Sequence, residues 1–423
     1  MTAVEVWVRL DGADVLAGTL YGHRRRHVEA ASFSYRAEYL STPGAYALDP
    51  ALPLVLGAQQ TRVGQALFGA FSDCAPDRWG RTLVLRREAA LARTERRPAR
   101  QLGETDYLLG VRDDLRQGAL RFRLADEAQF LAGDQSRVPA LTDLPQLLDL
   151  AERAEHPDSF STAADLPDLQ RLVRVGSSLG GARPKAHVRD TGGRIAIAKF
   201  PSAQSDSWNV MAWEKVALDL AVDAGVEVPA SKLLSLAGRS VLVLDRFDRT
   251  TDGERIGYVS AMTMLEASDG DQRSYIEIAE VIENASARAT FELQQLWRRI
   301  VFNVLISNTD DHLRNHGFLH VRGDVWRLAP AFDLNPDPAP GPKLLSTTID
   351  VADDHASIQL ALDVADYFRL TDEDARTVLH DVAGAVGLWR QVAHRHGLSE
   401  QEIARMEPAF ASPSPGSGNG SRA

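Results

Sequence analysis

A strongly polar stretch, NTDDHLRNHGF at residues 308–318, follows the mostly apolar run Val301–Ile306. It places Asp310 five residues before Asn315, and a further carboxylate, Asp333, follows in the segment AFDLNP. A carboxylate can accept a hydrogen bond from a hydroxyl group that is about to react. Carboxylate and amide oxygens are also the hard ligands that Mg²⁺ prefers. These three residues are therefore candidates for one acid–base group and two magnesium ligands.

A second set of candidates comes earlier in the chain and suits the binding of phosphate groups. The loop Gly176–Gly181 contains three glycines, which let backbone N–H groups approach an anion. Lys199 ends a predicted strand over residues 195–199, and Glu214 lies on the predicted helix that follows. A helix glutamate in this position can orient the lysine ammonium group against two phosphates.

The order of these features along the chain is that of the protein-kinase template. In that template a glycine-rich loop, a strand lysine, a helix glutamate, the spacing D-x-x-x-x-N and a second metal-binding aspartate follow one another. Each feature alone is common, but all five occur here in this order. Phosphoryl transfer requires an aimed hydroxyl and neutralised negative charge, and these residue types supply both. His312 and Arg314 could add donors toward the transferred phosphate, whereas Asp311 is expected only to cap the turn.

The basic residues are almost all arginine. Of the 47 lysines and arginines, five are lysine, and two of these, Lys185 and Lys199, lie within the predicted phosphate-binding region. A lysine in such a background marks a place where the compact charge of an ammonium group is better suited than the planar guanidinium of arginine. The basic stretches His23–His27 and Arg86–Arg100 are instead expected to be solvated surface.

Composition excludes several classes of protein. The formal charge is 47 − 58 = −11, which disfavours unaided binding to nucleic acid. No apolar run approaches the ~18 residues of a membrane helix, and Glu5 and Arg9 stand where a signal peptide would be apolar, so a cytoplasmic protein is expected. The single cysteine, Cys74, permits no internal disulfide and no thiolate zinc site.

The first part of the chain reads as a small α/β module. Short strands predicted between Val4 and Phe122 include a hairpin that turns at Asp11-Gly12 and a strand pair near Tyr107–Phe122, with helical text at Leu67–Arg93. Residues 125–169 are acidic and contain four prolines, which predicts a connection with one short helix.

The second part combines a strand-rich segment with a mostly helical one. Two strands flank the turn at 191–193, and a helix with an apolar stripe is expected to begin at a Ser207 cap and to end at Gly225. Strands return in residues 230–249, and the chain beyond Ser274 is mostly helical apart from a hairpin that turns at residues 322–324. The last residues predict a disordered tail.

The segments SSLGGARPKA, IAIAKF, LVLDRFDR, NTDDHLRNHGF and LAPAFDLNP, with LPL in the N-terminal module, resemble the HipA family of serine/threonine-kinase toxins over nearly the whole chain. The resemblance implies an α+β, two-lobed protein-kinase-like fold, with an extra N-terminal α/β subdomain on the small lobe and a mainly helical C-terminal lobe. The implied boundaries are 1–125 for the N-terminal subdomain, 126–170 for a linker region, 171–250 for the small lobe, 251–410 for the catalytic lobe and 411–423 for the tail.

The resemblance also assigns roles by position. Asp310 matches the catalytic base, Asn315 and Asp333 match the Mg²⁺ ligands, and Ser178 matches the autophosphorylated serine. Ser177 adjoins Ser178, so either is a candidate for modification. The residues that match the ATP-binding positions are Gly180, Gly181, Ala182, Arg183, Lys185, Lys199, Glu214, Asp245, Arg246, Phe247, His312, Leu313, Arg314 and Phe332. Arg183-Pro184 departs from the pair in the founding member, which leaves the side-chain contacts of the loop open.

The family resemblance implies a toxin that pairs with a helix-turn-helix antitoxin of HipB type, through which it meets DNA only indirectly. It implies phosphorylation of an aminoacyl-tRNA synthetase, glutamyl-tRNA synthetase by analogy, with ATP and Mg²⁺ as cofactors and autophosphorylation as the off-switch. Two alternatives stay open: a small-molecule kinase, and a co-repressor that acts with a DNA-binding partner. A metal hydrolase built on Asp310, Asp311 and His312 is disfavoured because adjacent residues rarely converge on one ion.

Overall fold

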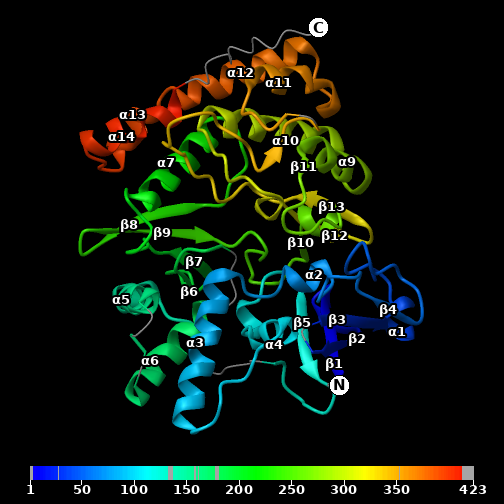
Figure 1. The fold of residues 1–423 in the computed structure, drawn as a ribbon. Helices are drawn as coiled ribbons and strands as arrows, with labels where there is room; N and C mark the ends of the chain where they lie inside the picture. Colours follow the sequence, from blue (N-terminus) through cyan, green and yellow to red (C-terminus); the bar gives the residue numbers. More distant parts are fainter. Residues whose placement is uncertain are drawn as a thin grey trace. The chain divides into compact units, whose positions relative to one another are not determined.

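The computed structural model describes residues 3–26, 28–131, 137–156, 159–160, 162–176, 181–351 and 353–411. The chain divides into two compact units (Figure 1). Unit 1 comprises residues 1–207, 234–266 and 318–326, and unit 2 comprises residues 208–233, 267–317 and 327–423. Both units are therefore discontinuous in sequence. None of the helices in the described residues is long and apolar enough to cross a membrane.

Unit 1 contains a five-stranded sheet with the strand order β4-β3-β2-β1-β5. Its strands are β1 (Ala3–Leu10), β2 (Ala13–Arg25), β3 (Val28–Tyr35), β4 (Ala58–Gln60) and β5 (Leu120–Leu124). The predicted hairpin turn at Asp11-Gly12 is confirmed, because both residues have positive φ (45° and 78°), as a tight turn between β1 and β2 requires. One face of the sheet is buried through Val4, Val6 and Val8.

The helical text at Leu67–Arg93 is confirmed by α2 (Gly69–Ser72) and α3 (Arg78–Thr94). The strand pair predicted near Tyr107–Phe122 is wrong, because Tyr107 lies on α4 (Glu104–Gly110) and only β5 is a strand. Asp106 Oδ2 accepts a hydrogen bond from Gly103 N at 2.9 Å and so caps α4. The buried guanidinium of Arg116 donates to the carbonyl of Leu108 at 3.0 Å, near the other end of α4.

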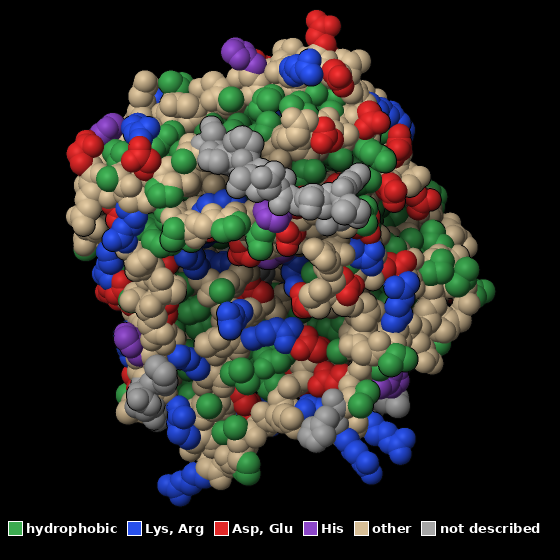
Figure 2. Space-filling model, turned by 45° about the horizontal axis from the view of Figure 1, so that its top comes forward, with side chains coloured by type: hydrophobic (Ala, Val, Ile, Leu, Met, Phe, Trp, Pro, Cys, Tyr) green, Lys and Arg blue, Asp and Glu red, His purple; other side chains and the backbone are tan. Residues whose placement is uncertain are grey.

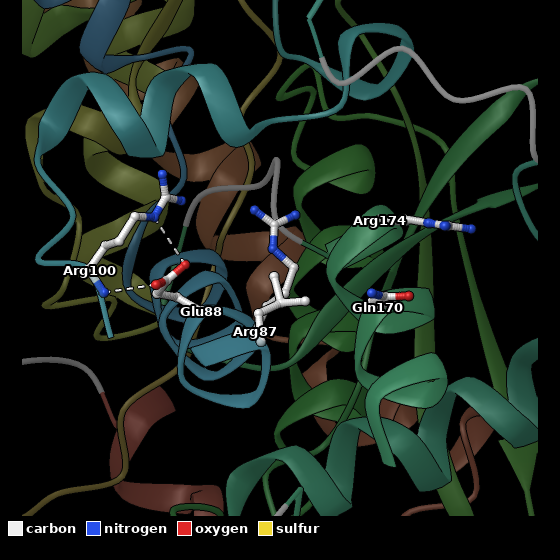
Figure 3. A pocket seen from close by; sticks show the side chains of 6 residues that line it. Arg87, Glu88, Arg100, Gln170 and Arg174 are labelled. Carbon is white, nitrogen blue, oxygen red and sulfur yellow. Dashed lines mark hydrogen bonds and ion pairs between the residues drawn. The ribbon is translucent and has the colours of Figure 1, made fainter. Parts of the chain in front are cut away.

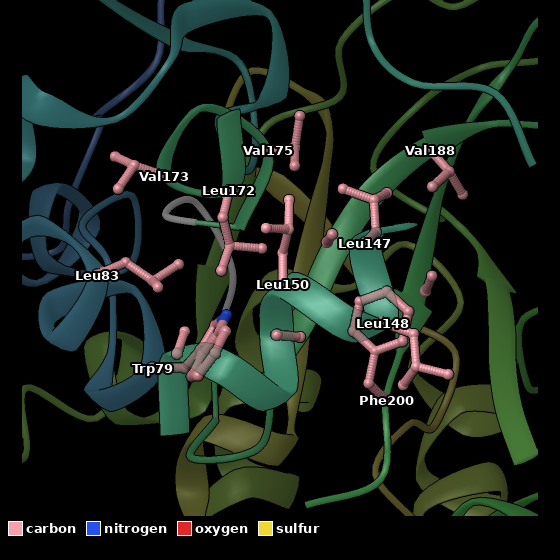
Figure 4. Close-up of a cluster of buried hydrophobic side chains, with 14 of the residues drawn as sticks. Trp79, Leu83, Leu147, Leu148, Leu150, Leu172, Val173, Val175, Val188 and Phe200 are labelled. Atoms are coloured by element: carbon pink, nitrogen blue, oxygen red, sulfur yellow. The ribbon is translucent and has the colours of Figure 1, made fainter. Parts of the chain in front are cut away.

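The segment expected to be a connection with one short helix contains α5 (Leu144–Glu155) and the first turn of α6 (Leu166–Gly176). The prolines of this segment do not interrupt helices, because Pro145 and Pro167 stand at the starts of α5 and α6, where no intrahelical N–H bond is lost. Apolar side chains of α5 and α6 are buried with Trp79 and Leu83 of α3 in one cluster (Figure 4). The helices α5 and α6 therefore belong to the core of unit 1.

A four-stranded sheet with the order β6-β7-β9-β8 follows α6 in the chain. Its strands are β6 (Lys185–Arg189), β7 (Ile195–Lys199), β9 (Arg239–Asp245) and β8 (Ser231–Leu236), as the sequence predicts. Ala186, Val188, Ala196 and Ala198 lie in the same core cluster as α5 and α6. The opposite face of β7 carries Lys199.

Unit 2 is mainly helical, as predicted. Its helices are α7 (Val210–Asp223), α9 (Tyr275–Ala285), α10 (Ala289–Leu305), α11 (Ile358–Asp363), α12 (Asp372–Val386), α13 (Trp389–Arg395) and α14 (Glu400–Phe410). The expected Ser207 cap of α7 is wrong: Asn209 is the N-cap, and its side chain accepts from Ala212 N at 3.2 Å. Gly225 ends the helix as predicted, with φ of 75°.

The core of unit 2 contains buried tryptophans. Trp297 of α10 is fully buried and donates to Ala361 O at 2.8 Å, which joins α10 to α11. Trp389 stacks on Phe410 with ring centroids 4.5 Å apart, which joins α13 to α14. The buried part of α10 leads directly into the polar stretch at residues 308–318.

The predicted hairpin after this stretch consists of β12 (Gly317–Arg322) and β13 (Val325–Leu328), in a sheet with the order β10-β12-β13. The other short elements are α1 (Ala37–Leu40), β10 (Tyr258–Ser260), α8 (Ala261–Met264), β11 (Arg273–Ser274), β14 (Thr347–Thr348) and the 3-10 helices at Asp113–Leu115, Leu141–Asp143, Ala163–Asp165, Leu313–Asn315 and Ala365–Phe368.

The face drawn in Figure 2 carries acidic and basic side chains interspersed.

Candidate functional site

The stretch that follows α10 in unit 2 forms a tight loop. Asp310 O accepts hydrogen bonds from His312 N at 3.0 Å and from Asn315 Nδ2 at 3.2 Å. His312 O accepts from Asn315 N at 2.8 Å, which closes the short 3-10 turn at Leu313–Asn315. Asp310 is exposed, whereas Asn315 is 7% exposed. The loop therefore holds the predicted base at the surface of unit 2 and anchors the predicted metal ligand beneath it.

Asp333 lies in a second loop of unit 2 and has a left-handed backbone, with φ of 61°. Asn335 Nδ2 donates to Asp333 O at 3.2 Å and to Asp333 Oδ1 at 3.3 Å. A non-glycine residue with positive φ is uncommon, although aspartate tolerates this conformation better than most residues. The loop fixes the half-buried Asp333 in a conformation that costs backbone energy, which is typical of functional sites.

Hydrogen bonds join these two loops. Asn308 Oδ1 accepts from Asn335 N at 3.4 Å, and Ser307 O accepts from Asp337 N at 3.3 Å. Asn308 is itself buried and donates to Asn303 Oδ1 of α10 at 3.1 Å. The segment that carries Asp310 and the segment that carries Asp333 are therefore anchored to each other and to α10.

Asp311 is not the simple turn cap that the sequence predicts. Its buried carboxylate accepts hydrogen bonds from Asn303 Nδ2 and His316 Nε2, both at 2.8 Å, and from the Tyr275 hydroxyl. Burial alone would raise the pKa of Asp311, but the charge of His316 and the hydrogen bonds from His316 and Tyr275 outweigh it and hold the pKa below its ordinary value. Asp311 therefore stays ionised and ties the loop to α9 and α10.

The neighbours of Asp311 point differently. Asp310 and His312 are exposed while Asp311 is buried, so these three side chains do not converge on one ion, and the metal-hydrolase alternative loses its ligand set. Arg314 is exposed and forms an ion pair with Asp269, with Nη2 at 3.0 Å from Oδ2. Leu313 is buried in unit 2. His312 is thus the exposed imidazole of the loop.

Lys185 and Lys199, predicted to bind phosphates, lie opposite each other across the β6–β7 ladder in unit 1. Directly opposed residues on antiparallel strands project from the same face, with Cβ atoms about 5 Å apart. Lys185 is 4% exposed, and its Nζ lies 4.0 Å from Asp77 Oδ2. Two like charges in register destabilise a ladder, so this pair concentrates positive charge at the ends of the two strands.

The loop before Lys185 is described from Gly181 onward. Gly181 has φ of +98°, and a Cβ placed there would lie 2.5 Å from Lys185 Nζ, so only glycine fits without a shift. Trp79 Nε1 of α3 donates to Lys185 O at 3.1 Å. Arg183 forms an ion pair with Asp206 at 2.9 Å, and Ala182 is exposed. Gly180, Ser177 and Ser178 lie outside the described residues.

The predicted hinge follows β9. Asp245 is the last residue of β9 and forms an ion pair with Arg194 at 3.2 Å. The side chain of Arg246 is buried: it binds the Asp248 carboxylate at 2.6 and 2.8 Å and donates to His187 Nε2 at 2.8 Å. Burial, followed by the charge of Arg246, holds the pKa of His187 well below its ordinary value, so this imidazole is neutral. The Arg246 side chain is therefore structural, and the predicted adenine contact concerns the backbone.

The predicted residues divide between the two units. Gly181, Lys185, Lys199 and the hinge belong to unit 1, whereas Glu214, Phe332 and the residues of the 308–333 loops belong to unit 2. Glu214 is buried on α7 and Phe332 is half-buried. In unit 1 the two lysines and the hinge lie on neighbouring strands of one sheet, and in unit 2 the loops that carry Asp310 and Asp333 are hydrogen-bonded to each other.

Sequence reasoning missed the residues that hold these groups in place. Asn308 and Asn335 connect the Asp310 and Asp333 loops, and Asp311 joins them to Tyr275 and Asn303. The available signal was the density of amides, in ISN and DLNP, beside the two carboxylates. Amides in such loops satisfy backbone groups that lie outside regular elements.

Residues 177–389 match the family described as HipA-like C-terminal domain. This match spans half of the chain and includes every predicted catalytic and metal-binding residue. The chain belongs to the HipA family. Solved structures agree: HipA of Shewanella oneidensis MR-1, from a complex with HipB and operator DNA, matches 97% of this chain and 96% of its own length with a TM-score of 0.65 at 15% identity. The two-lobed HipA-like kinase fold is thereby confirmed.

Curated relatives carry kinase names. A protein of Haemophilus influenzae named "Putative kinase" is 27% identical over 150 residues, which are 32% of this chain and 43% of the relative. A protein of Sinorhizobium fredii named "Putative kinase Y4mE" is 26% identical over 234 residues, which are 46% of this chain and 54% of the relative. The matches span about half the length of these relatives. This HipA-family chain is therefore similar to proteins that carry kinase names.

Proposed function

We propose that this chain is an ATP- and Mg²⁺-dependent kinase that phosphorylates a serine or threonine hydroxyl of a protein and acts as the toxin of a toxin–antitoxin pair. The observation that carries the proposal is the hydrogen-bond network between the Asp310 and Asp333 loops of unit 2. Phosphoryl transfer depends on positioned groups, and this network fixes the positions of the groups that the family uses.

Asp310 is the proposed catalytic base. Its carboxylate is exposed, while its backbone carbonyl is bound by Asn315 Nδ2 and His312 N. A base anchored through its backbone can accept the proton of an incoming hydroxyl without a change in the loop. His312, exposed two residues later, is a proposed donor toward the transferred phosphate.

Asn315 and Asp333 are the proposed Mg²⁺ ligands. Their donor atoms fit the ion, because amide and carboxylate oxygens are hard ligands and Asp333 is held in a fixed backbone conformation. Bound Mg²⁺ would neutralise charge on the phosphates of ATP. The protein contributes the fixed orientation: Asn335 holds Asp333, and the 3-10 turn holds Asn315.

Lys185 and Lys199 are proposed to bind the phosphates of ATP, with Glu214 orienting Lys199. The support is the register of the two lysines across β6 and β7 in a chain with only five lysines. Bound phosphate would relieve the repulsion between the two ammonium groups. Asp245, Arg246 and Phe247 are proposed to receive adenine through the backbone.

The substrate and partner proposals rest on family membership. We infer an aminoacyl-tRNA synthetase as the substrate, with glutamyl-tRNA synthetase as the first candidate, and a helix-turn-helix antitoxin as the partner. The related Shewanella HipA was solved with HipB and operator DNA, which supports such a partner. Phosphorylation of Ser178, or of Ser177, is the proposed off-switch, because a dianion beside the loop would repel the phosphates of ATP.

The test is incubation of the purified chain with labelled ATP and Mg²⁺, alone and with a lysate of its own cells, followed by mass spectrometry of the labelled proteins. The matched variants are Asp310→Gln and Asp324→Gln, the second at an exposed hairpin position. Label on a lysate protein that is lost in Asp310→Gln and kept in Asp324→Gln supports the proposal and identifies the substrate.

Other outcomes select the alternatives. Labelled small molecules without labelled protein would favour a metabolite kinase. ATP binding without transfer to any acceptor would favour a co-repressor. Equal transfer by Asp310→Gln and the unchanged chain would remove Asp310 from the role of base.

A further inference from the structure

A cavity of about 580 Å³ in unit 1 is lined by arginines. Five contribute to it: Arg112, Arg137, Arg171, Arg174 and Arg189. The only carboxylate of the lining is Asp143, so the formal charge of the lining is 5 − 1 = +4. None of these residues belongs to the proposed kinase site. We call this space the arginine cavity.

The walls of the arginine cavity are built from packed elements. Arg171 and Arg174 stand three residues apart on α6, which places them on one side of the helix. Arg189 N of β6 donates to Pro139 O at 2.7 Å, and Ala140 forms a parallel bridge with Arg189. The segment that contains Pro139 and Ala140 is thereby held against the edge of the sheet, so the cavity has a defined shape.

The charge of this cavity is only partly neutralised by the protein. Arg112 binds the Asp114 carboxylate at 2.6 and 2.8 Å. Arg171 donates to Gln146 at 2.9 Å and lies 3.8 Å from Asp143. Within the described residues, no carboxylate forms an ion pair with Arg137 or Arg189, although Arg189 Nη1 donates to Gly193 O at 2.6 Å. In a chain of net charge −11, this concentration of positive charge needs an explanation.

A smaller neighbouring cavity, of about 240 Å³, provides a contrast (Figure 3). It shares Arg174 with the arginine cavity and is also lined by Arg87 and Arg100. Here Glu88 accepts hydrogen bonds from Arg97 Nη1 at 2.5 Å and from Arg100 N at 2.8 Å, and these bonds, that of Arg97 above all, lower the pKa of Glu88 to about 2. The lining of the smaller cavity therefore has a formal charge of 3 − 1 = +2, with Glu88 fully engaged by arginines, against +4 for the arginine cavity.

We infer that the arginine cavity binds a small molecule that carries two or more phosphate groups. Guanidinium forks match phosphate oxygens in paired hydrogen bonds and are always charged. Val138, Pro139 and Val175 add apolar wall for the organic part of such a ligand. The volume lies within the ~300–1,000 Å³ range of small-molecule sites.

The binding test uses the full-length chain and inorganic tripolyphosphate, titrated by calorimetry in buffer with EDTA. The background is Lys199→Met, which removes one of the two lysines proposed to bind nucleotide, and any heat that remains from that site is common to all variants. The test variant is Arg137→Gln/Arg189→Gln, and the control is Arg25→Gln/Arg26→Gln, which removes two exposed arginines outside the cavity. Circular dichroism of each variant confirms that it is folded.

Tripolyphosphate should bind one site per chain, at least about tenfold more weakly in Arg137→Gln/Arg189→Gln, since each lost guanidinium removes charged hydrogen bonds. The Arg25→Gln/Arg26→Gln control should bind as the background does. Equal weakening in both double variants would reflect net charge alone and would overturn the proposal. So would the absence of binding, or binding of a single-stranded RNA homopolymer through Arg137 and Arg189 without binding of tripolyphosphate.

Discussion

Lys185 and Lys199 face each other in register across β6 and β7, so that two ammonium-bearing side chains rise from one face of the sheet. Like charges in register repel. The Asp77 carboxylate, 4.0 Å from Lys185 Nζ, supplies part of the counter-charge. An added anion would be attracted by both ammonium groups, which supports the proposal that this ladder binds phosphate.

The lysine pair predicts a change in ligand-dependent stability. The unchanged chain should gain about 2.7 kcal/mol of stability when Mg–ATP is present at a hundred times its Kd. Lys199→Met should lose most of this gain. Thermal unfolding with and without Mg–ATP measures the gain in each variant. Lys232→Met, at an exposed strand lysine, is the control and should keep the full gain.

The left-handed backbone of Asp333 allows its effect on stability to be separated from its proposed role in metal binding. Asp333→Gly should fold at least as stably as the unchanged chain, because glycine has no Cβ penalty at φ of 61°. Asp333→Ala should be about 1–2 kcal/mol less stable than Asp333→Gly, since alanine keeps the Cβ that is strained in this region. Both variants should lose the Mg²⁺ dependence of nucleotide binding. Denaturant unfolding and ATP titration with and without Mg²⁺ separate the two effects, and a Mg²⁺ dependence that survives in Asp333→Gly would remove Asp333 from the metal site.

The buried Asp311 predicts a dependence of stability on acid. The pKa of Asp311 in the folded chain lies below its unfolded value of ~4. The ionised carboxylate therefore contributes fully to stability above about pH 4, and this contribution is lost as the pH falls through the folded pKa. Asp311→Asn should remove this acid dependence. It should also cost about 3–5 kcal/mol at neutral pH, because His316 loses a buried partner.

Urea unfolding of the unchanged chain and of Asp311→Asn, from pH 3 to pH 7, measures this difference. The exposed Asp324→Asn serves as the control and should follow the unchanged chain at every pH. An acid limb that is identical in Asp311→Asn would show that other carboxylates determine the acid sensitivity.

Local sequence patterns predicted the elements whose signals are local. The Asp11-Gly12 hairpin, the strands β6 to β9 and the Gly225 end of α7 follow from turn residues and alternation, and all are present. Errors arose where tertiary contacts decide. Tyr107 is β-prone but lies on a helix that Asp106 caps, and α5 and α6 tolerate prolines because these occupy their first turns.

The site shows the same division. The kinase-like order of Asp310, Asn315 and Asp333 is visible in the sequence because the chemistry requires these residue types. The roles of Asp311 and Arg246 are not visible, since a carboxylate or guanidinium is the same letter whether exposed or buried. Their partners, Tyr275 for Asp311 and His187 for Arg246, lie 36 and 59 residues away. The grouping of five arginines around the arginine cavity is likewise visible only in the folded chain, because they come from separate segments.

Gly181 predicts a separation between backbone strain and nucleotide binding. Its φ of +98° makes any other residue strained, and a new Cβ would meet Lys185 Nζ at 2.5 Å. Gly193, in the β6–β7 turn, has φ of +82° but no atom within 4 Å of such a Cβ. Both Gly181→Ala and Gly193→Ala should therefore lose about 1 kcal/mol of stability through the left-handed backbone.

Only Gly181→Ala should also displace the Lys185 ammonium group. This displacement should weaken ATP binding by about tenfold if one charged hydrogen bond is lost. Titration of a fluorescent ATP analogue against both variants measures this effect, with urea unfolding as the measure of strain. If Gly193→Ala weakened binding of the analogue as much as Gly181→Ala does, the loss of affinity would come from the strained hairpin. In that case the position of Lys185 beside Gly181 would have no part in binding phosphate.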